Sequence, residues 1–170
     1  IGHGQTISKP SVVARMVELL FDGRSARDTG HLGRTLEIGT GCGYQTALLA
    51  RLATRVVSIE RLRPLFDKAQ ANLATWMPRR DLDQIRLVFA DGMLGHAPNA
   101  PYDSLIAAAG GEELPVAWLD QLAVGGRLVA PMQRPGGRGQ VLVVIDRRES
   151  GLVRTEHEAV HFVPLKSGTV

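Results

Sequence analysis

The stretch that decides the fold is Leu36-Glu37-Ile38-Gly39-Thr40-Gly41-Cys42-Gly43. Residues 35–38 predict a short apolar strand, and the glycines that follow predict a tight turn beyond its end. The spacing differs from the dinucleotide-binding pattern G-x-G-x-x-G, because the third glycine comes one residue early. Glu37 lies just before the turn, where a carboxylate would repel a pyrophosphate but attract a ligand with sulfonium and ammonium groups.

Helical and strand-like patterns alternate around this turn. Helices are expected at residues 10–21, 44–53, 62–77 and 115–122, and strands at 35–38, 55–59, 85–89, 102–107 and 126–131. The polar residues 22–33 are expected to form a loop. Such alternation predicts helices on both faces of a sheet, and therefore an α/β fold with a Rossmann-like, doubly wound, mostly parallel sheet.

The C-terminal part of the chain has a different pattern. Residues 140–146 and 155–163 are both strand-like, and only a short turn around Ser150-Gly151 separates them. Because a short turn can join only antiparallel strands, an antiparallel edge is expected at the C-terminal end of the sheet.

Length and composition indicate one domain over residues 1–170. The chain has 44% hydrophobic and 22% charged residues, a balance that excludes disordered and collagen-like proteins. No apolar run approaches the ~20 residues of a membrane span, so no membrane partner is expected. Since Cys42 is the only cysteine, an intramolecular disulfide and a multi-cysteine zinc site are excluded. A single cysteine fits a reducing compartment, and a cytoplasmic location is expected.

The charged residues do not indicate a nucleic-acid partner. The 20 Lys and Arg and 17 Asp and Glu give a formal net charge of +3, and basic pairs such as Arg79-Arg80 and Arg147-Arg148 are scattered. A nucleic-acid surface more often has a dense basic cluster with interleaved aromatic residues. The five histidines have no metal-ligand spacing, so no metal is expected. Trp76 and Trp118 fall on helical segments and are expected in the core.

Two more carboxylates follow the next two predicted strands, Glu60 after the second and Asp91 after the third. In an open parallel sheet, ligands bind beyond the carboxyl ends of the strands. Glu60 could accept hydrogen bonds from ribose hydroxyls, and Asp91 could accept one from an adenine amine. The alternative for each is a turn or cap residue. Together with the glycine turn, these acids favour S-adenosylmethionine over NAD as the cofactor.

Several stretches resemble the protein-L-isoaspartate (D-aspartate) O-methyltransferase family. They are Gln5-Thr6-Ile7-Ser8, residues 36–47, residues 57–61, Asp91-Gly92, residues 125–131 and residues 160–165. The G-T-G-C-G core is generic to class I S-adenosylmethionine-dependent methyltransferases, whereas Q-T-I-S and F-V-P-L are more specific to this family. The resemblance covers nearly the whole chain. It implies methyl transfer to the carboxylate of L-isoaspartyl and D-aspartyl residues, which initiates repair of damaged proteins, with isoaspartyl-containing proteins and peptides as partners.

The resemblance also implies roles for individual positions. The cofactor S-adenosyl-L-methionine would be held by Glu37, Gly39, Thr40, Gly41, Gly43, Glu60, Arg61, Asp91 and Gly92. Thr6 and Ser8 would be catalytic, with Ser8 facing the reacting carboxylate. The alternative for Ser8 is the N-cap of the helix at 10–21. The substrate peptide would be held by Ile7, Val160, Val163, Pro164 and Leu165.

The chain departs from the family pattern in three places. Lys9, which is expected to point outward, stands where members often have a small residue or glutamine. Residues 108–113 replace a more usual proline-bearing loop, and members usually carry a helical segment before the position of Ile1, which this domain is expected to lack. Two alternative functions stay open, a non-catalytic S-adenosylmethionine-binding module and a class I methyltransferase with another substrate.

Overall fold

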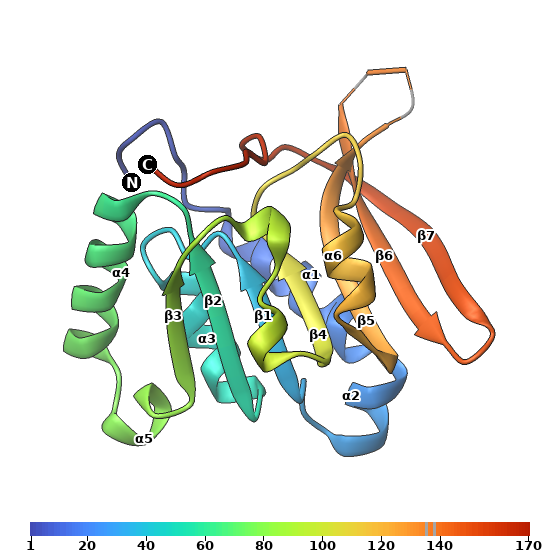
Figure 1. Ribbon diagram of the computed structural model, residues 1–170, viewed down its shortest axis with the longest axis horizontal. Helices are drawn as coiled ribbons and strands as arrows, with labels where there is room; N and C mark the ends of the chain where they lie inside the picture. Colours follow the sequence, from blue (N-terminus) through green and yellow to red (C-terminus); the bar gives the residue numbers. More distant parts are fainter. Residues whose placement is uncertain (135, 138) are drawn as a thin grey trace.

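The computed structural model describes residues 1–134, 136–137 and 139–170. Within these residues seven strands form one sheet in the order β3-β2-β1-β4-β5-β6-β7 (Figure 1). Strands β1 to β5 are parallel, whereas β6 and β7 are antiparallel to their neighbours. The strands are β1 (Arg34–Ile38), β2 (Arg55–Glu60), β3 (Ile85–Phe89), β4 (Tyr102–Ala107), β5 (Leu122–Gln133), β6 (Gln140–Arg148) and β7 (Gly151–Val160). The predicted fold class and the antiparallel edge are therefore confirmed.

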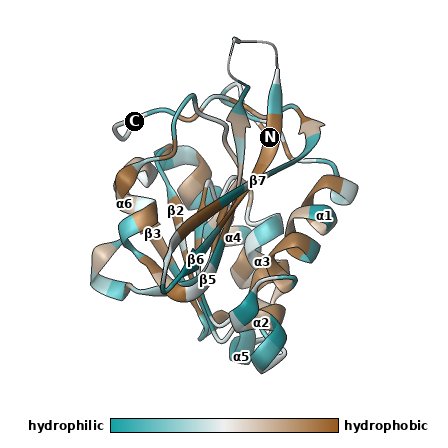
Figure 2. Ribbon diagram, turned by 90° about the vertical axis from the view of Figure 1, so that its right-hand side faces the viewer, coloured by the Kyte–Doolittle hydropathy of each residue, from teal (hydrophilic) through white to brown (hydrophobic). Residues whose placement is uncertain are grey.

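Helices cover both faces of the sheet (Figure 2). One face carries α1 (Pro10–Phe21), α2 (Arg24–Thr29) and α3 (Tyr44–Leu52), and α4 (Arg63–Trp76) and α5 (Arg79–Leu82) extend this layer beside β2 and β3. The other face carries α6 (Val116–Asp120) and the short 3-10 helices η1 (Gly92–Leu94) and η2 (Ala97–Asn99). No helix in the described part of the chain is long and apolar enough to cross a membrane.

The core consists of two apolar clusters, one on each face of the sheet. Successive side chains of a strand point to opposite faces, so Leu36 and Ile38 of β1 join the cluster under α6, together with Trp118. Residues of α1 and α3, such as Leu20 and Leu49, fill the other cluster. Glu37 alternates with the two apolar residues of β1 and therefore points to the α3 face.

Several observed elements differ from the predicted ones. Residues 22–33 are not all loop, because α2 forms within them and ends at Gly30 with φ +77°. The short helix α5 was not predicted. Strand β5 begins at Leu122 rather than 126, because Leu122 pairs with Tyr102 of β4 across an irregularity in the register. Strand β7 covers Gly151–Val160 rather than 155–163.

Two side-chain predictions are also wrong. The backbone N-cap of α1 is Lys9, and no side chain caps this helix, so Ser8 is not its N-cap. Trp76 is the last residue of α4 and 81% exposed, whereas Trp118 is fully buried as expected.

Candidate active site

A cavity opens at the carboxyl ends of β1 and β2. Its wall contains the end of β1 and the turn that follows, the end of β2 and the residues that follow it, and single residues of α4 and η1. These residues are Ile38, Gly39, Gly41, Ile59, Glu60, Arg61, Leu62, Leu65 and Gly92. Both ends of the chain cover it, with Ile1, Gln5 and Thr6 from one end and residues 163–166 from the other (Figure 1). Counting the solvent space at its open mouth, the cavity has about 660 Å³ of empty space.

The turn after β1 has the backbone conformation that its glycines permit. Gly39, Gly41 and Gly43 all have positive φ, and Gly43 forms the N-terminal end of α3. A Cβ on Gly43 would lie 3.1 Å from Leu73 of α4, so space as well as φ favours glycine there. Gly39 and Gly41 line the cavity, whereas Gly43 does not.

Glu60 joins this turn to the end of β2. Its Oε2 accepts a hydrogen bond from the Gly41 amide and its Oε1 accepts one from the Leu62 amide, both at 2.9 Å. The side chain is only 5% exposed, yet it lines the cavity. The structure therefore places Glu60 at the position that the sequence predicts, with its orientation fixed by two backbone amides.

Glu37, which was predicted to contact a ligand, is not among the residues that line the cavity. It is fully buried, and its carboxylate accepts hydrogen bonds from Gln45 and Thr46 of α3 and from Ser58 of β2. Burial raises the pKa of Glu37 to about 7, although the hydrogen bonds from Ser58, Thr46 and Gln45 act in the opposite direction. Glu37 thus anchors the start of α3 to the sheet beneath the turn.

Thr40 belongs to the same buried network. Its Oγ1 lies 2.6 Å from the Ser58 Oγ, and its side chain is 3% exposed. A small hollow beside the turn is lined by Thr40 together with Gly39, Gly41, Thr6 and Ser8. The two segments that the sequence assigns to cofactor and catalysis are therefore adjacent.

Both carboxylate oxygens of Asp91, which was predicted to bind the cofactor, accept hydrogen bonds from backbone amides. Its Oδ1 accepts from the Met93 amide and caps η1, while its Oδ2 accepts from the Gly168 amide at 2.6 Å. Asp91 therefore caps η1 in this structure, and its contact with the cofactor stays a prediction. Its neighbour Gly92 does line the cavity, and the Gly92 carbonyl accepts from the Trp118 indole Nε1 at 2.8 Å.

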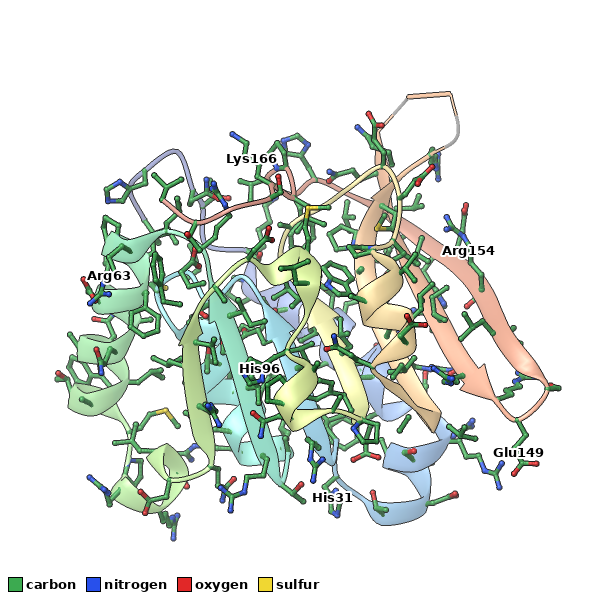
Figure 3. All side chains as sticks on the ribbon, in the orientation of Figure 1. His31, Arg63, His96, Glu149, Arg154 and Lys166 are labelled. Carbon is green, nitrogen blue, oxygen red and sulfur yellow. The ribbon has the colours of Figure 1, made fainter. Side chains whose placement is uncertain are left out.

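The C-terminal segment is held against the cavity by residues after β2. The Arg61 Nε donates to the Gly168 carbonyl at 2.8 Å, and the backbones of Arg61 and Arg63 both pair with Val170. Lys166 lies on this segment above the carboxyl ends of the strands (Figure 3). Arg61 therefore acts in this structure as a contact of the C-terminal segment at the cavity wall.

A second hollow, which we call the Ser8 groove, adjoins the cavity. It is lined by residues 6–9, Val12, Ala108 and residues 159–163. Ser8, Ile7, Val160 and Val163 meet here as the sequence predicts, whereas Pro164 and Leu165 line the cavity instead. Thr6, Ala108 and Val163 line both spaces, so the cavity and the groove share one wall. Lys9 lines the groove as well, and it is exposed, in agreement with the outward orientation expected for it.

The comparison with protein families identifies the chain. The model of the protein-L-isoaspartate(D-aspartate) O-methyltransferase family matches residues 1–170. The chain belongs to this family. A protein-L-isoaspartate O-methyltransferase of Methylibium petroleiphilum is 64% identical over 170 residues, which cover 99% of this chain and 61% of the relative. A protein-L-isoaspartate O-methyltransferase of Leptothrix cholodnii is 62% identical over 170 residues, which cover 99% of this chain and 58% of the relative. The chain thus spans about three fifths of the length of these curated relatives.

Solved structures of the isoaspartate methyltransferase family have the same fold. One described as protein-L-isoaspartate O-methyltransferase has a TM-score of 0.82 at 26% identity, over 98% of this chain and 51% of that one. A putative member from Plasmodium falciparum, in complex with S-adenosyl-L-homocysteine, has a TM-score of 0.80 at 24% identity, over 98% of this chain and 78% of that one. The fold of the family is therefore shared along the whole chain.

The apolar wall of the cavity was not predicted from the sequence. Ile38, Ile59, Leu62 and Leu65 line the cavity, but apolar residues at these positions were assigned only to strands and a helix. The available signal was position, because Ile38 ends β1 and Ile59 lies next to the end of β2, where an open parallel sheet binds its ligands.

Proposed function

We propose that this chain transfers a methyl group from S-adenosylmethionine to the carboxylate of L-isoaspartyl and D-aspartyl residues in damaged proteins. The observation that carries the proposal is the wall shared by the cavity and the Ser8 groove, formed by Thr6, Ala108 and Val163. A cofactor in the cavity and a peptide in the groove would meet at this wall. Bringing two reactants together in this way supplies much of the rate enhancement of a transfer reaction.

The residues of the cavity fit S-adenosylmethionine. Gly41 places backbone without a side chain at the cavity wall, and a Cβ there would lie only 3.2 Å from the Ile1 side chain. Glu60 supplies a carboxylate for ribose hydroxyls, and Ile59, Leu62 and Leu65 supply apolar surface for an adenine ring. Gly39, Gly41, Gly92 and Glu60 would hold the cofactor directly, while Glu37, Thr40 and Gly43 would fix the turn.

The protein's part in the reaction is to position the substrate. The chemistry that the bound cofactor supplies is an electrophilic methyl group on a positively charged sulfur. A substrate carboxylate with a pKa near 4 is already ionised at neutral pH, so no general base is needed. Ser8 would donate a hydrogen bond to the non-attacking oxygen and fix the rotation of the carboxylate. The covered cavity would exclude water that competes for the methyl group.

Methyl transfer to matched peptides tests the proposal. We expect labelled methyl groups from S-adenosylmethionine to reach an isoaspartyl peptide and not the same peptide with aspartate. Cofactor binding without transfer would favour a non-catalytic binding module. Transfer only to acceptors of another chemical class would favour a class I methyltransferase with a different substrate.

Replacing Glu60 with alanine is expected to weaken binding of S-adenosylhomocysteine by roughly 1–3 kcal/mol, because ribose hydroxyls and the Gly41 and Leu62 amides would lose their acceptor. Calorimetry measures the affinity. Asp67→Ala on α4 is the control, since Asp67 is an exposed carboxylate paired with Arg63. Equal affinities of folded Glu60→Ala and Asp67→Ala proteins would remove Glu60 from the cofactor site.

Replacing Ser8 with alanine is expected to lower kcat roughly tenfold or more, because a hydrogen bond to a charged group contributes about 1.5–3 kcal/mol. The melting temperature should stay near that of the wild type, because no side chain caps α1. Affinity for S-adenosylhomocysteine should also stay close to the wild-type value. Ser11→Ala, at an exposed position of α1, is the matched control. Full turnover in Ser8→Ala would show that its hydroxyl does not orient the substrate.

A further inference from the structure

The Ser8 groove has an uneven charge. Among its lining residues, all within the described part of the chain, the ionisable ones are Lys9 and His161, and no aspartate or glutamate lines it. The nearest acidic residue in the chain, Glu158, precedes the lining residues 159–163. Its Oε1 accepts from the Arg15 Nε at 2.6 Å, and the same arginine also binds Glu18. The groove lining therefore carries the positive charge of Lys9, and the adjacent Glu158 carboxylate is engaged by Arg15.

Lys9 has a fixed backbone and an unpaired side chain. Its carbonyl accepts from the amides of Val12 and Val13 at the start of α1, which holds its Cα in place. Within the described residues its ammonium group forms no salt bridge or hydrogen bond, whereas the Lys68 ammonium donates to the Ile1 carbonyl. A lysine at the rim of a groove, free of internal partners, is available to a bound ligand.

The place of Lys9 along the groove suggests what it contacts. Consecutive Cα atoms are 3.8 Å apart, so Lys9 directly adjoins the residue proposed to face the reacting carboxylate. An extended peptide advances about 3.3–3.6 Å per residue, so a long lysine side chain can reach the side chain one or two positions from the isoaspartyl residue. Lys9 lines the groove, where the peptide is proposed to bind, but not the cavity proposed for the cofactor.

We propose that Lys9 is a specificity-determining residue that favours isoaspartyl sites with an acidic side chain one or two positions away. This assignment rests on the proposed function. The attraction between Lys9 and the flanking carboxylate would act across a solvent-exposed groove, where such pairs have modest strength. We therefore expect about a two- to fivefold preference in kcat/KM rather than an absolute requirement.

The test compares isoaspartyl peptides that differ at one flanking position, placed on either side of the isoaspartyl residue and carrying Glu, Gln or Lys. In the wild type, kcat/KM should be about two- to fivefold higher for Glu than for Gln on at least one side. The ratio should fall to about 1 in Lys9→Gln and invert in Lys9→Glu. It should also fall in the wild type near 1 M salt, where the Debye length is only about 3 Å.

Two controls separate this effect from others. Arg148→Gln also removes one positive charge, at the end of β6. The next residue, Glu149, lies at the opposite end of the sheet from Lys166 (Figure 3). It should keep the wild-type ratio. His161→Gln measures the contribution of the other ionisable residue of the groove. If the ratio of kcat/KM for the Glu and Gln peptides is the same in wild type and Lys9→Gln, the assignment of Lys9 is overturned, but the proposed function is not. Methylation of none of these peptides would overturn the proposed function and the assignment with it.

Discussion

Replacing Trp118 with alanine is expected to lower the free energy of unfolding by about 3–5 kcal/mol. The indole is fully buried in the apolar cluster between α6 and the sheet, so truncation removes a large contact surface and leaves a cavity. It also removes the donor to the Gly92 carbonyl. Denaturant titration measures the change, which is large compared with the total stability of an ordinary domain.

The chain contains a matched control for this substitution. Trp76 is also at a helical position but is 81% exposed, so Trp76→Ala is expected to change stability by less than about 0.5 kcal/mol. Trp118→Phe separates the two contributions, since it keeps an aromatic ring and leaves the Gly92 carbonyl without its donor, at a cost of about 1–3 kcal/mol. Similar losses for Trp76→Ala and Trp118→Ala would contradict the burial on which the prediction depends.

The contrast between the two tryptophans shows how far periodicity predicts burial. Both lie on segments with a helical pattern, but α4 ends at Trp76, beyond its last buried residue Leu73. The pattern predicts that a helix forms, but it does not predict at which residue the helix stops packing against the sheet. The same limit applies to α2, whose six residues contain only one buried side chain, Ala26, and so have no apolar period to detect.

The acids at the strand ends show the corresponding limit for the site. Their positions were predictable, because each lies at or just after the end of an apolar strand, but their partners come from elsewhere in the chain. Glu37 lies opposite Ser58 in the register of β1 with β2 and below Gln45 and Thr46 of α3. Asp91 binds the Gly168 amide, 77 positions away. Strand alternation could have placed Glu37 on the α3 face, whereas nothing local predicts the contact of Asp91.

Ionisation of Glu37 is expected to lower the free energy of unfolding by about 3 kcal/mol between pH 4.5 and about 7. Burial raises the pKa of Glu37 in the folded protein from 4.5 to about 7, and the nearby Glu60 carboxylate adds to this. In this pH range the folded protein retains a proton that the unfolded chain has released, so each rise in pH favours unfolding. The stabilising contribution is fully present below pH 4.5 and is lost as the pH rises through 7.

The isosteric substitution Glu37→Gln should remove this pH dependence, because an amide does not ionise and the hydroxyls of Thr46 and Ser58 can accept its hydrogen bonds. Urea unfolding at several pH values between 4.5 and 8 measures the effect as the difference between wild type and variant. Above pH 7 the variant should be the more stable protein, since it avoids a buried charge beneath the glycine turn. Glu112→Gln, at an exposed position, controls for the loss of one carboxylate. Parallel stability curves for wild type and Glu37→Gln would mean that Glu37 ionises as readily in the folded protein as in the unfolded chain, and that water reaches the network beneath the turn.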